Sequence, residues 1–167
     1  GPVQSGRTNA MAWLAQSLLR WKPDLPLVHL SSRRSPLSGL DLWSASAAGA
    51  DAARPVIERL LAVTAEQSGD GLPLIAVLVE GYPDFLSGPV ESQLAELVRN
   101  CRNNGHLFIA EGESSGWNSS WPMLSEVKNA RTGLLLQPDP MDGDMVLRTP
   151  LPRFRKGDPI PGRGWWI

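Results

Sequence analysis

The short apolar run Pro73–Gly81 (PLIAVLVEG) constrains the fold of this chain more than any other feature. The run is too short to be a helix of its own, and apolar and polar residues do not alternate along it. This pattern is typical of a parallel strand that is covered on both faces by other elements. Two further short apolar segments, Leu27–Leu30 and His106–Ala110, are therefore predicted to lie beside Leu74–Val79 as neighbouring core strands.

Helical patterns separate these predicted strands. Apolar residues at helical spacing predict helices over Met11–Leu19, Val56–Thr64 and Val90–Cys101, with a short helix over Trp121–Ala130. Arg33–Ala50 is rich in Ser, Gly and Pro, so it is expected to be a loop. Late strand candidates are Gly133–Gln137, Met145–Leu147 and Gly164–Ile167. The alternation of strands and helices predicts an α/β fold with a mainly parallel sheet.

Length and composition fit one globular domain that spans residues 1–167. Hydrophobic residues make up 42% of the chain and charged residues 20%, which argues against global disorder. The single cysteine, Cys101, excludes an internal disulfide and a multi-cysteine zinc site, and its place on an apolar helical stripe predicts a core residue. No apolar run approaches the ~20 residues that a membrane span requires, so the chain itself is expected to be soluble.

The opening GPVQSGRT (Gly1–Thr8) fits the phosphate-loop pattern G-x-x-x-x-G-K-[ST], except that Arg7 stands in place of lysine. In such loops backbone N–H groups surround phosphate oxygens, and the Ser/Thr hydroxyl holds Mg²⁺. Arg7 keeps the positive charge, but a planar guanidinium does not replace a compact ammonium. The residues therefore predict a site for ATP and Mg²⁺. The alternatives are a glycine turn without a ligand, or a cloning remnant at Gly1-Pro2 that imitates the motif.

A phosphate loop normally follows a strand, and no residue precedes Gly1 in this sequence. We therefore expect the first strand of the sheet to be absent from the chain. Glu80, which ends the central apolar run, is the candidate metal-binding acid, and Glu111 is a candidate polar sensor at the end of the next strand. Gly81 supplies no catalytic carboxylate. Because phosphoryl transfer depends on positioned charges, these departures predict weak or lost hydrolysis. The alternative is that both acids are ordinary strand-end residues.

One rival motif can be excluded from residue order. GESSG (Gly112–Gly116) fits the nucleophile-elbow pattern of α/β-hydrolases, in which the catalytic histidine follows the serine. The two histidines, His29 and His106, both precede Ser114. A hydrolase triad in that order is therefore excluded.

Taken together, these segments resemble an FtsK/SpoIIIE-type ATPase domain, specifically the last, degenerate ATPase module of the EccC-type ATPases of bacterial type VII (ESX) secretion. The resemblance covers most of the chain. It rests on the order and spacing of GPVQSGRT, VHLSSRRSPL (Val28–Leu37), LIAVLVEGYPDFLSGP (Leu74–Pro89), GHLFIAEGESS (Gly105–Ser115), GLLLQPDPMDGD (Gly133–Asp144) and PGRGWWI (Pro161–Ile167).

The resemblance implies a RecA-like P-loop NTPase fold with three layers. Carried over by motif, the residues implied to bind ATP are Gly1, Ser5, Gly6, Arg7, Thr8 and Glu80, with Thr8 and Glu80 holding Mg²⁺. It further implies a role in recognising the substrate signal and regulating neighbouring ATPase domains of the same protein. The implied setting is a type VII secretion membrane complex at the cytoplasmic face of the cell membrane, with WXG100-type proteins as substrates. The alternatives are a slow but active ATPase and an FtsK-type DNA translocase.

The tryptophans and the basic C-terminal segment bear on these alternatives. Core packing accounts for most of the seven tryptophans, but Trp117 and Trp121 are candidates to line an apolar groove for a substrate helix. A DNA translocase would need a basic surface with exposed aromatic residues. The net charge of the chain is −1, and the basic residues between Arg148 and Ile167 are few: Arg148, Arg153, Arg155, Lys156 and Arg163, against Asp158. DNA binding is therefore the least favoured alternative.

Overall fold

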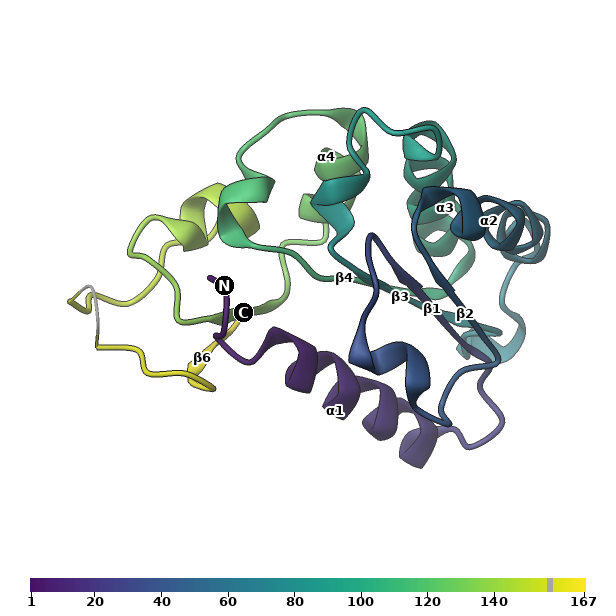
Figure 1. The fold of residues 1–167 in the computed structure, drawn as a ribbon, viewed down its shortest axis with the longest axis horizontal. Coiled ribbons are helices and arrows are strands. Elements are labelled where there is room, and N and C mark those ends of the chain that lie inside the picture. The colour runs from purple at the N-terminus through teal and green to yellow at the C-terminus, as the bar shows by residue number, and fades with distance from the viewer. Residues whose placement is uncertain (156–157) are drawn as a thin grey trace.

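The computed structural model describes residues 1–155 and 158–167. Its main sheet has four parallel strands in the order β2-β1-β3-β4 (Figure 1). The strands are β1 (Leu27–Ser31), β2 (Ala45–Ala48), β3 (Ala76–Glu80) and β4 (Leu107–Ala110). All four β3 residues before Glu80 are fully buried, which explains why the run shows no polar alternation. The prediction of three neighbouring core strands is confirmed.

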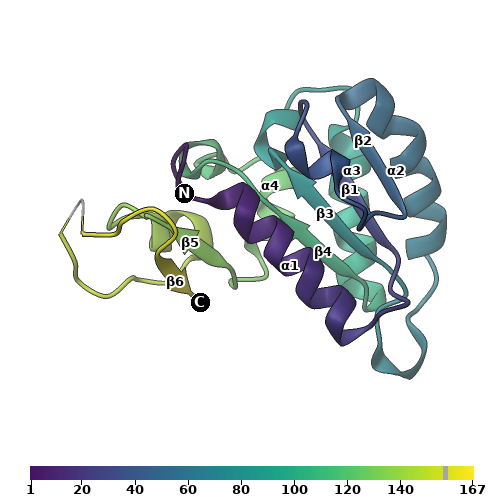
Figure 2. The ribbon, with the colours of Figure 1, turned by 60° about the horizontal axis from the view of Figure 1, so that its bottom comes forward.

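Helices cover both faces of this sheet, so the molecule has three layers (Figure 2). Helix α1 (Arg7–Trp21) lies on one face, where Met11 and Ala15 pack with Leu78 of β3. On the other face Val77 and Val79 of β3 pack with apolar side chains from α2 (Ala50–Thr64), α3 (Glu91–Asn104) and α4 (Pro122–Lys128). Cys101 is buried on the inner side of α3, as predicted. The predicted α/β layer architecture is confirmed.

Two of the local predictions are wrong. The stretch Arg33–Ala50 is not only loop, because it contains β2. The sequence of β2, ASAA, lacks the β-branched and aromatic residues that favour strands, so it gives almost no signal. Met145–Leu147 is not a strand but part of a single π-helical turn, Gly143–Leu147. Val146 and Leu147 are buried there, and burial alone does not separate a short strand from a turn.

The C-terminal strands form a separate antiparallel pair, β5 (Leu134–Leu136) with β6 (Gly164–Trp166). Both were predicted as strands. The segment before β6 reaches the phosphate loop, since the Gly162 N–H donates to the Ser5 carbonyl at 3.0 Å. Figure 2 shows the N-terminus and β6 close to the start of α1. Lys156, counted in the basic segment, lies outside the described residues.

Within the described ranges, none of the helices combines the length and the apolar character needed to cross a membrane.

Candidate functional site

The phosphate loop turns directly into α1. Gly6 is the residue before the helix and has a left-handed backbone conformation, with φ of 95°, which glycine adopts at little cost. Among the described residues, no side-chain cap is found at the start of α1, and the first turn of this helix contains no acidic residue. The first-turn N–H groups of the helix are therefore available to an acceptor, and the helix dipole favours a negative one.

A polar cleft of about 290 Å³ lies beside this helix start, at the carboxyl ends of β1 and β3. Crevices in this position are where open parallel sheets bind ligands. The cleft brings together side chains from four separate parts of the chain. They are Arg7, Thr8, the six residues 31–36, Glu80, Gly81, Asp84, Glu111 and Glu113.

Thr8 and Glu80 meet inside the polar cleft. The Thr8 hydroxyl donates to Glu80 Oε1 at 3.1 Å, which joins the first turn of α1 to the end of β3. Burial raises the pKa of the Glu80 carboxyl, but contacts with His29, Ser35 and Thr8 outweigh burial and hold that pKa below its ordinary value. Glu80 is therefore an anion at neutral pH. A hydroxyl and a carboxylate side by side are oxygen donors of the kind that Mg²⁺ takes together with phosphate and water.

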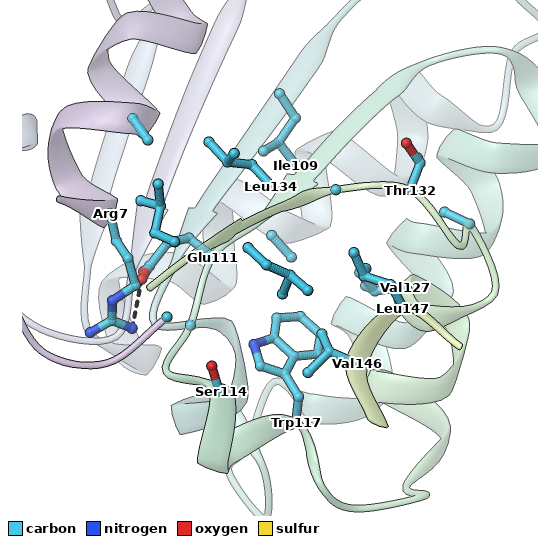
Figure 3. A pocket seen from close by; sticks show the side chains of 18 of the residues that line it. Arg7, Ile109, Glu111, Ser114, Trp117, Val127, Thr132, Leu134, Val146 and Leu147 are labelled. Atoms are coloured by element: carbon cyan, nitrogen blue, oxygen red, sulfur yellow. Dashed lines mark ion pairs between the residues drawn. The ribbon is translucent and has the colours of Figure 1, made fainter. Parts of the chain in front are cut away.

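Arg7 is held by an acid from the neighbouring strand. Its Nη1 lies 2.8 Å from Glu111 Oε1, and both side chains are largely buried (Figure 3). The second carboxylate oxygen of Glu111 accepts from the Gly81 N–H at 3.0 Å. The guanidinium at the lysine position of the motif is thus already paired. A phosphate at the loop has to compete with Glu111 for it.

The backbone at Gly81 leaves no room for a side chain. Gly81 has φ of 68°, in the left-handed region. A Cβ at this position would overlap the Ser32 hydroxyl and come within 2.9 Å of Asp84 Oδ2. Ser32 donates to Asp84 at 2.9 Å, so these two side chains fill the space as a bonded pair. An acid at this position would therefore have to displace the Ser32–Asp84 pair and adopt a strained backbone conformation.

Comparison with solved structures finds the same overall fold. The chain matches a structure described as the cytoplasmic domain of EssC with a TM-score of 0.67 and 16% identity, over 99% of this chain and 36% of the other. It matches EssC (ATPases 2 and 3) from Geobacillus thermodenitrificans with a TM-score of 0.68 and 17% identity, over 99% and 33%. The chain has the EssC fold. This confirms the predicted resemblance at the level of fold, and the chain spans about a third of each of these structures.

Neither a protein-family model nor a curated protein matches the chain.

Within the EssC fold, the predicted site residues separate into three groups. Arg7, Thr8 and Glu80 line the polar cleft together. Ser5 is fully buried beneath the loop, and Gly6 provides its turn. Gly1 is part of the lining of a second hollow, which is described next.

An apolar cavity of about 270 Å³ lies on the other side of Arg7 and Glu111, which line both hollows. Its walls include β4, β5 and the indole of Trp117 (Figure 3). Trp117 is buried and stacks on Tyr82, with ring centroids 5.7 Å apart. Trp121 is 54% exposed and is not part of the lining. Of the two candidate groove tryptophans, Trp117 lines this cavity, whereas Trp121 lines neither the cavity nor the polar cleft.

Sequence reasoning missed part of the polar cleft. The cleft is also lined by Asp84 and by residues 31–36, which are the end of β1 and the segment after it with two arginines. None of these residues was predicted to belong to the site. His29, which the sequence does not link to this site, is fully buried behind Glu80. The sequence could have predicted the place of the loop after β1. This loop follows a predicted parallel strand, so it lies at the same edge of the sheet as Glu80.

Proposed function

We propose that this chain is a nucleotide-binding domain of a type VII secretion ATPase, with little or no hydrolytic activity of its own. The observation that carries the proposal is the Thr8–Glu80 hydrogen bond at the uncapped start of α1. This bond joins the two residues that a P-loop enzyme uses around Mg²⁺, although 72 positions separate them in sequence. The EssC fold supports the same assignment.

The phosphates of ATP would bind at the N-terminus of α1. The first-turn N–H groups would donate to phosphate oxygens, and Arg7 would add a planar, bidentate cation. Thr8 and Glu80 would hold Mg²⁺, which neutralises charge on the phosphates when it is bound. Each of these groups lines the polar cleft or opens the helix beside it.

Two features support weak or lost hydrolysis. Gly81 provides no carboxylate, and the Ser32–Asp84 pair occupies the space where one would begin. Arg7 is paired with Glu111, so part of its charge is already compensated. Phosphoryl transfer relies on charges that are positioned in advance. The site is therefore better suited to hold a nucleotide than to cleave it.

The similarity to EssC ATPase domains is what supports the proposed partners. We propose that the domain lies beside other ATPase domains of one longer protein, at the cytoplasmic face of the membrane and within the secretion complex. We further propose that it contacts the C-terminal signal of WXG100-type substrates. The apolar cavity supports this role, because its wall contains the Trp117 indole and aliphatic side chains of β4 and β5. Such surfaces accept apolar residues of an amphipathic segment.

Calorimetric titration with ATP, with and without Mg²⁺, tests the nucleotide site. We expect Mg²⁺-dependent binding that Thr8→Ala or Glu80→Gln weakens, with turnover far below that of an intact P-loop enzyme. Ser119→Ala is the control, since Ser119 contributes a hydroxyl outside the polar cleft. Absence of ATP binding by the unaltered chain would contradict the proposal. Rapid turnover abolished by Thr8→Ala would favour the active-ATPase alternative.

Fluorescence titration with a WXG100 C-terminal peptide tests the partner. We expect micromolar affinity, about −8 kcal/mol, and a spectral shift that Trp117→Phe removes and Trp121→Phe preserves. A scrambled peptide of equal charge is the control. If neither peptide binds while duplex DNA binds tightly at ~150 mM salt, the DNA translocase becomes the favoured assignment.

A further inference from the structure

His29 lies behind the candidate metal-binding acid and is fully buried on β1. Its Nδ1 lies 3.0 Å from the Ser46 hydroxyl on the neighbouring strand β2. Its Nε2 lies 3.6 Å from Glu80 Oε2, just beyond the length of a hydrogen bond. The imidazole thus bridges the edge of the sheet and the acid at the end of the central strand.

The two carboxylate oxygens of Glu80 have different surroundings. Oε1 accepts from Thr8, on the side of the phosphate loop. Oε2 is buried, and within the described part of the chain neither it nor His29 Nε2 has a hydrogen-bond partner. Leaving two buried polar atoms unpaired is costly, and a shift of less than 1 Å would pair them with each other.

The ring of His29 cannot easily turn away from Glu80. Trp43 stacks on it, with ring centroids 4.9 Å apart and an interplanar angle of 24°. Trp43 is itself fixed by donation from its Nε1 to the Leu37 carbonyl at 2.7 Å. The Ser46 hydroxyl is hydrogen-bonded to the other ring nitrogen of His29, Nδ1. His29 is therefore supported by a stacked ring and by a strand rather than by a mobile loop.

We propose that His29 is a positioning residue for Glu80. A neutral imidazole donates from one nitrogen and accepts at the other. With the proton on Nε2, His29 donates to Glu80 Oε2, and its Nδ1 accepts from the Ser46 hydroxyl. Glu80 is then held with Oε1 beside Thr8, where the metal would lie. Partners of this kind behind a ligand fix its orientation and commonly change metal affinity by about 10–100-fold. The proposal rests on the nucleotide site proposed above.

Two substitutions of His29 separate this contact from simple core packing. The amide nitrogen of Gln reaches about as far as Nε2 of histidine, whereas that of Asn reaches only as far as Nδ1. His29→Gln should keep most of the Mg²⁺-dependent gain in ATP affinity. His29→Asn should reduce this Mg²⁺-dependent gain in ATP affinity about tenfold, while ATP affinity measured without Mg²⁺ should change little. Equal gains for both variants, when both give native circular dichroism spectra, would overturn the proposal.

Nitrogen-15 NMR of His29 tests the contact without any nucleotide. The spectrum reports directly which ring nitrogen carries the proton. We expect the Nε2–H form, and a change in the His29 signals in Glu80→Gln but not in Glu113→Gln. The Nδ1–H form would overturn the proposal, because Nε2 could not donate. The Nε2–H form in a chain that does not bind ATP would support the His29–Glu80 contact and contradict the nucleotide-binding function.

Discussion

The polar cleft and the apolar cavity are nearly equal in size, at about 290 and 270 Å³, but they are built differently. The cleft is formed by strand ends and the loops that follow them, where hydroxyl, carboxylate and guanidinium groups converge. The cavity runs along β4, whose outer edge pairs with no strand among the described residues, and is bounded by β5 and an aromatic ring. The comparison teaches that strand ends bring polar and charged groups together here, whereas a strand edge leaves an apolar surface. Each prediction below tests either the polar cleft or the apolar cavity.

Removal of the Trp117 ring should break the cavity and produce the largest effect. The indole is buried and stacked on Tyr82, so Trp117→Ala is expected to cost about 3–5 kcal/mol of unfolding free energy. Trp121→Ala is the matched control, because that ring is 54% exposed, and it should cost about 0.5 kcal/mol or less. Urea denaturation measures both. Similar losses for the two variants would show that Trp117 does not support the cavity.

A side chain at position 81 should disturb the cleft without restoring chemistry. Gly81→Glu is expected to cost about 1–3 kcal/mol in stability from backbone strain, with a further loss from displacing the Ser32–Asp84 pair. ATP hydrolysis should not rise.

Gly49→Glu is the control for the Gly81 variant, since Gly49 also has positive φ but has open space around its Cβ position. Thermal unfolding and phosphate release are the measurements. Faster hydrolysis in Gly81→Glu would mean that the missing carboxylate alone limits the site.

Release of Arg7 should strengthen anion binding in the cleft. Glu111→Gln removes the charge that pairs with Arg7 at 2.8 Å but keeps an oxygen for the Gly81 N–H. We expect about tenfold tighter ATP binding, which corresponds to about 1.4 kcal/mol. Glu113→Gln removes one negative charge from the same cleft without touching that ion pair. Calorimetry that gives the same gain for both variants would assign the effect to net charge alone.

The smallest expected effect is on the pH dependence of the unfolding free energy, to which Glu80 in the polar cleft should contribute. The folded state lowers the pKa of Glu80 because its contacts with His29, Ser35 and Thr8 outweigh burial, which alone would raise that pKa. Its contribution to stability is therefore full above its unfolded pKa and is lost as the pH falls through the folded pKa. Glu80→Gln should flatten the acid limb of the stability curve, as measured by denaturation at a series of pH values. An unchanged limb would show that other carboxyl groups determine it.

The sequence predicted the fold where burial leaves a clear pattern. The fully apolar β3 identified a parallel sheet, and the strand-end rule identified Glu80 and Glu111 at one edge. β2 was missed because ASAA carries no strand propensity, and the turn at Met145–Leu147 was taken for a strand because buried apolar residues suit either form. The pairing of Arg7 with Glu111 depends on side chains far apart in sequence. Spacing along the chain cannot predict such a contact.

The Arg7–Glu111 pair is the wall that the cleft and the cavity share. A ligand that alters this pair from one side changes the free energy of binding on the other. Thermodynamic linkage requires the coupling to be reciprocal. If an anion that draws Arg7 away from Glu111 changes the affinity of the cavity for its occupant by some factor, the occupant must change the affinity of the cleft for that anion by the same factor. If both hollows bind the ligands proposed above, the two binding equilibria are coupled through this ion pair, whether or not the nucleotide is hydrolysed.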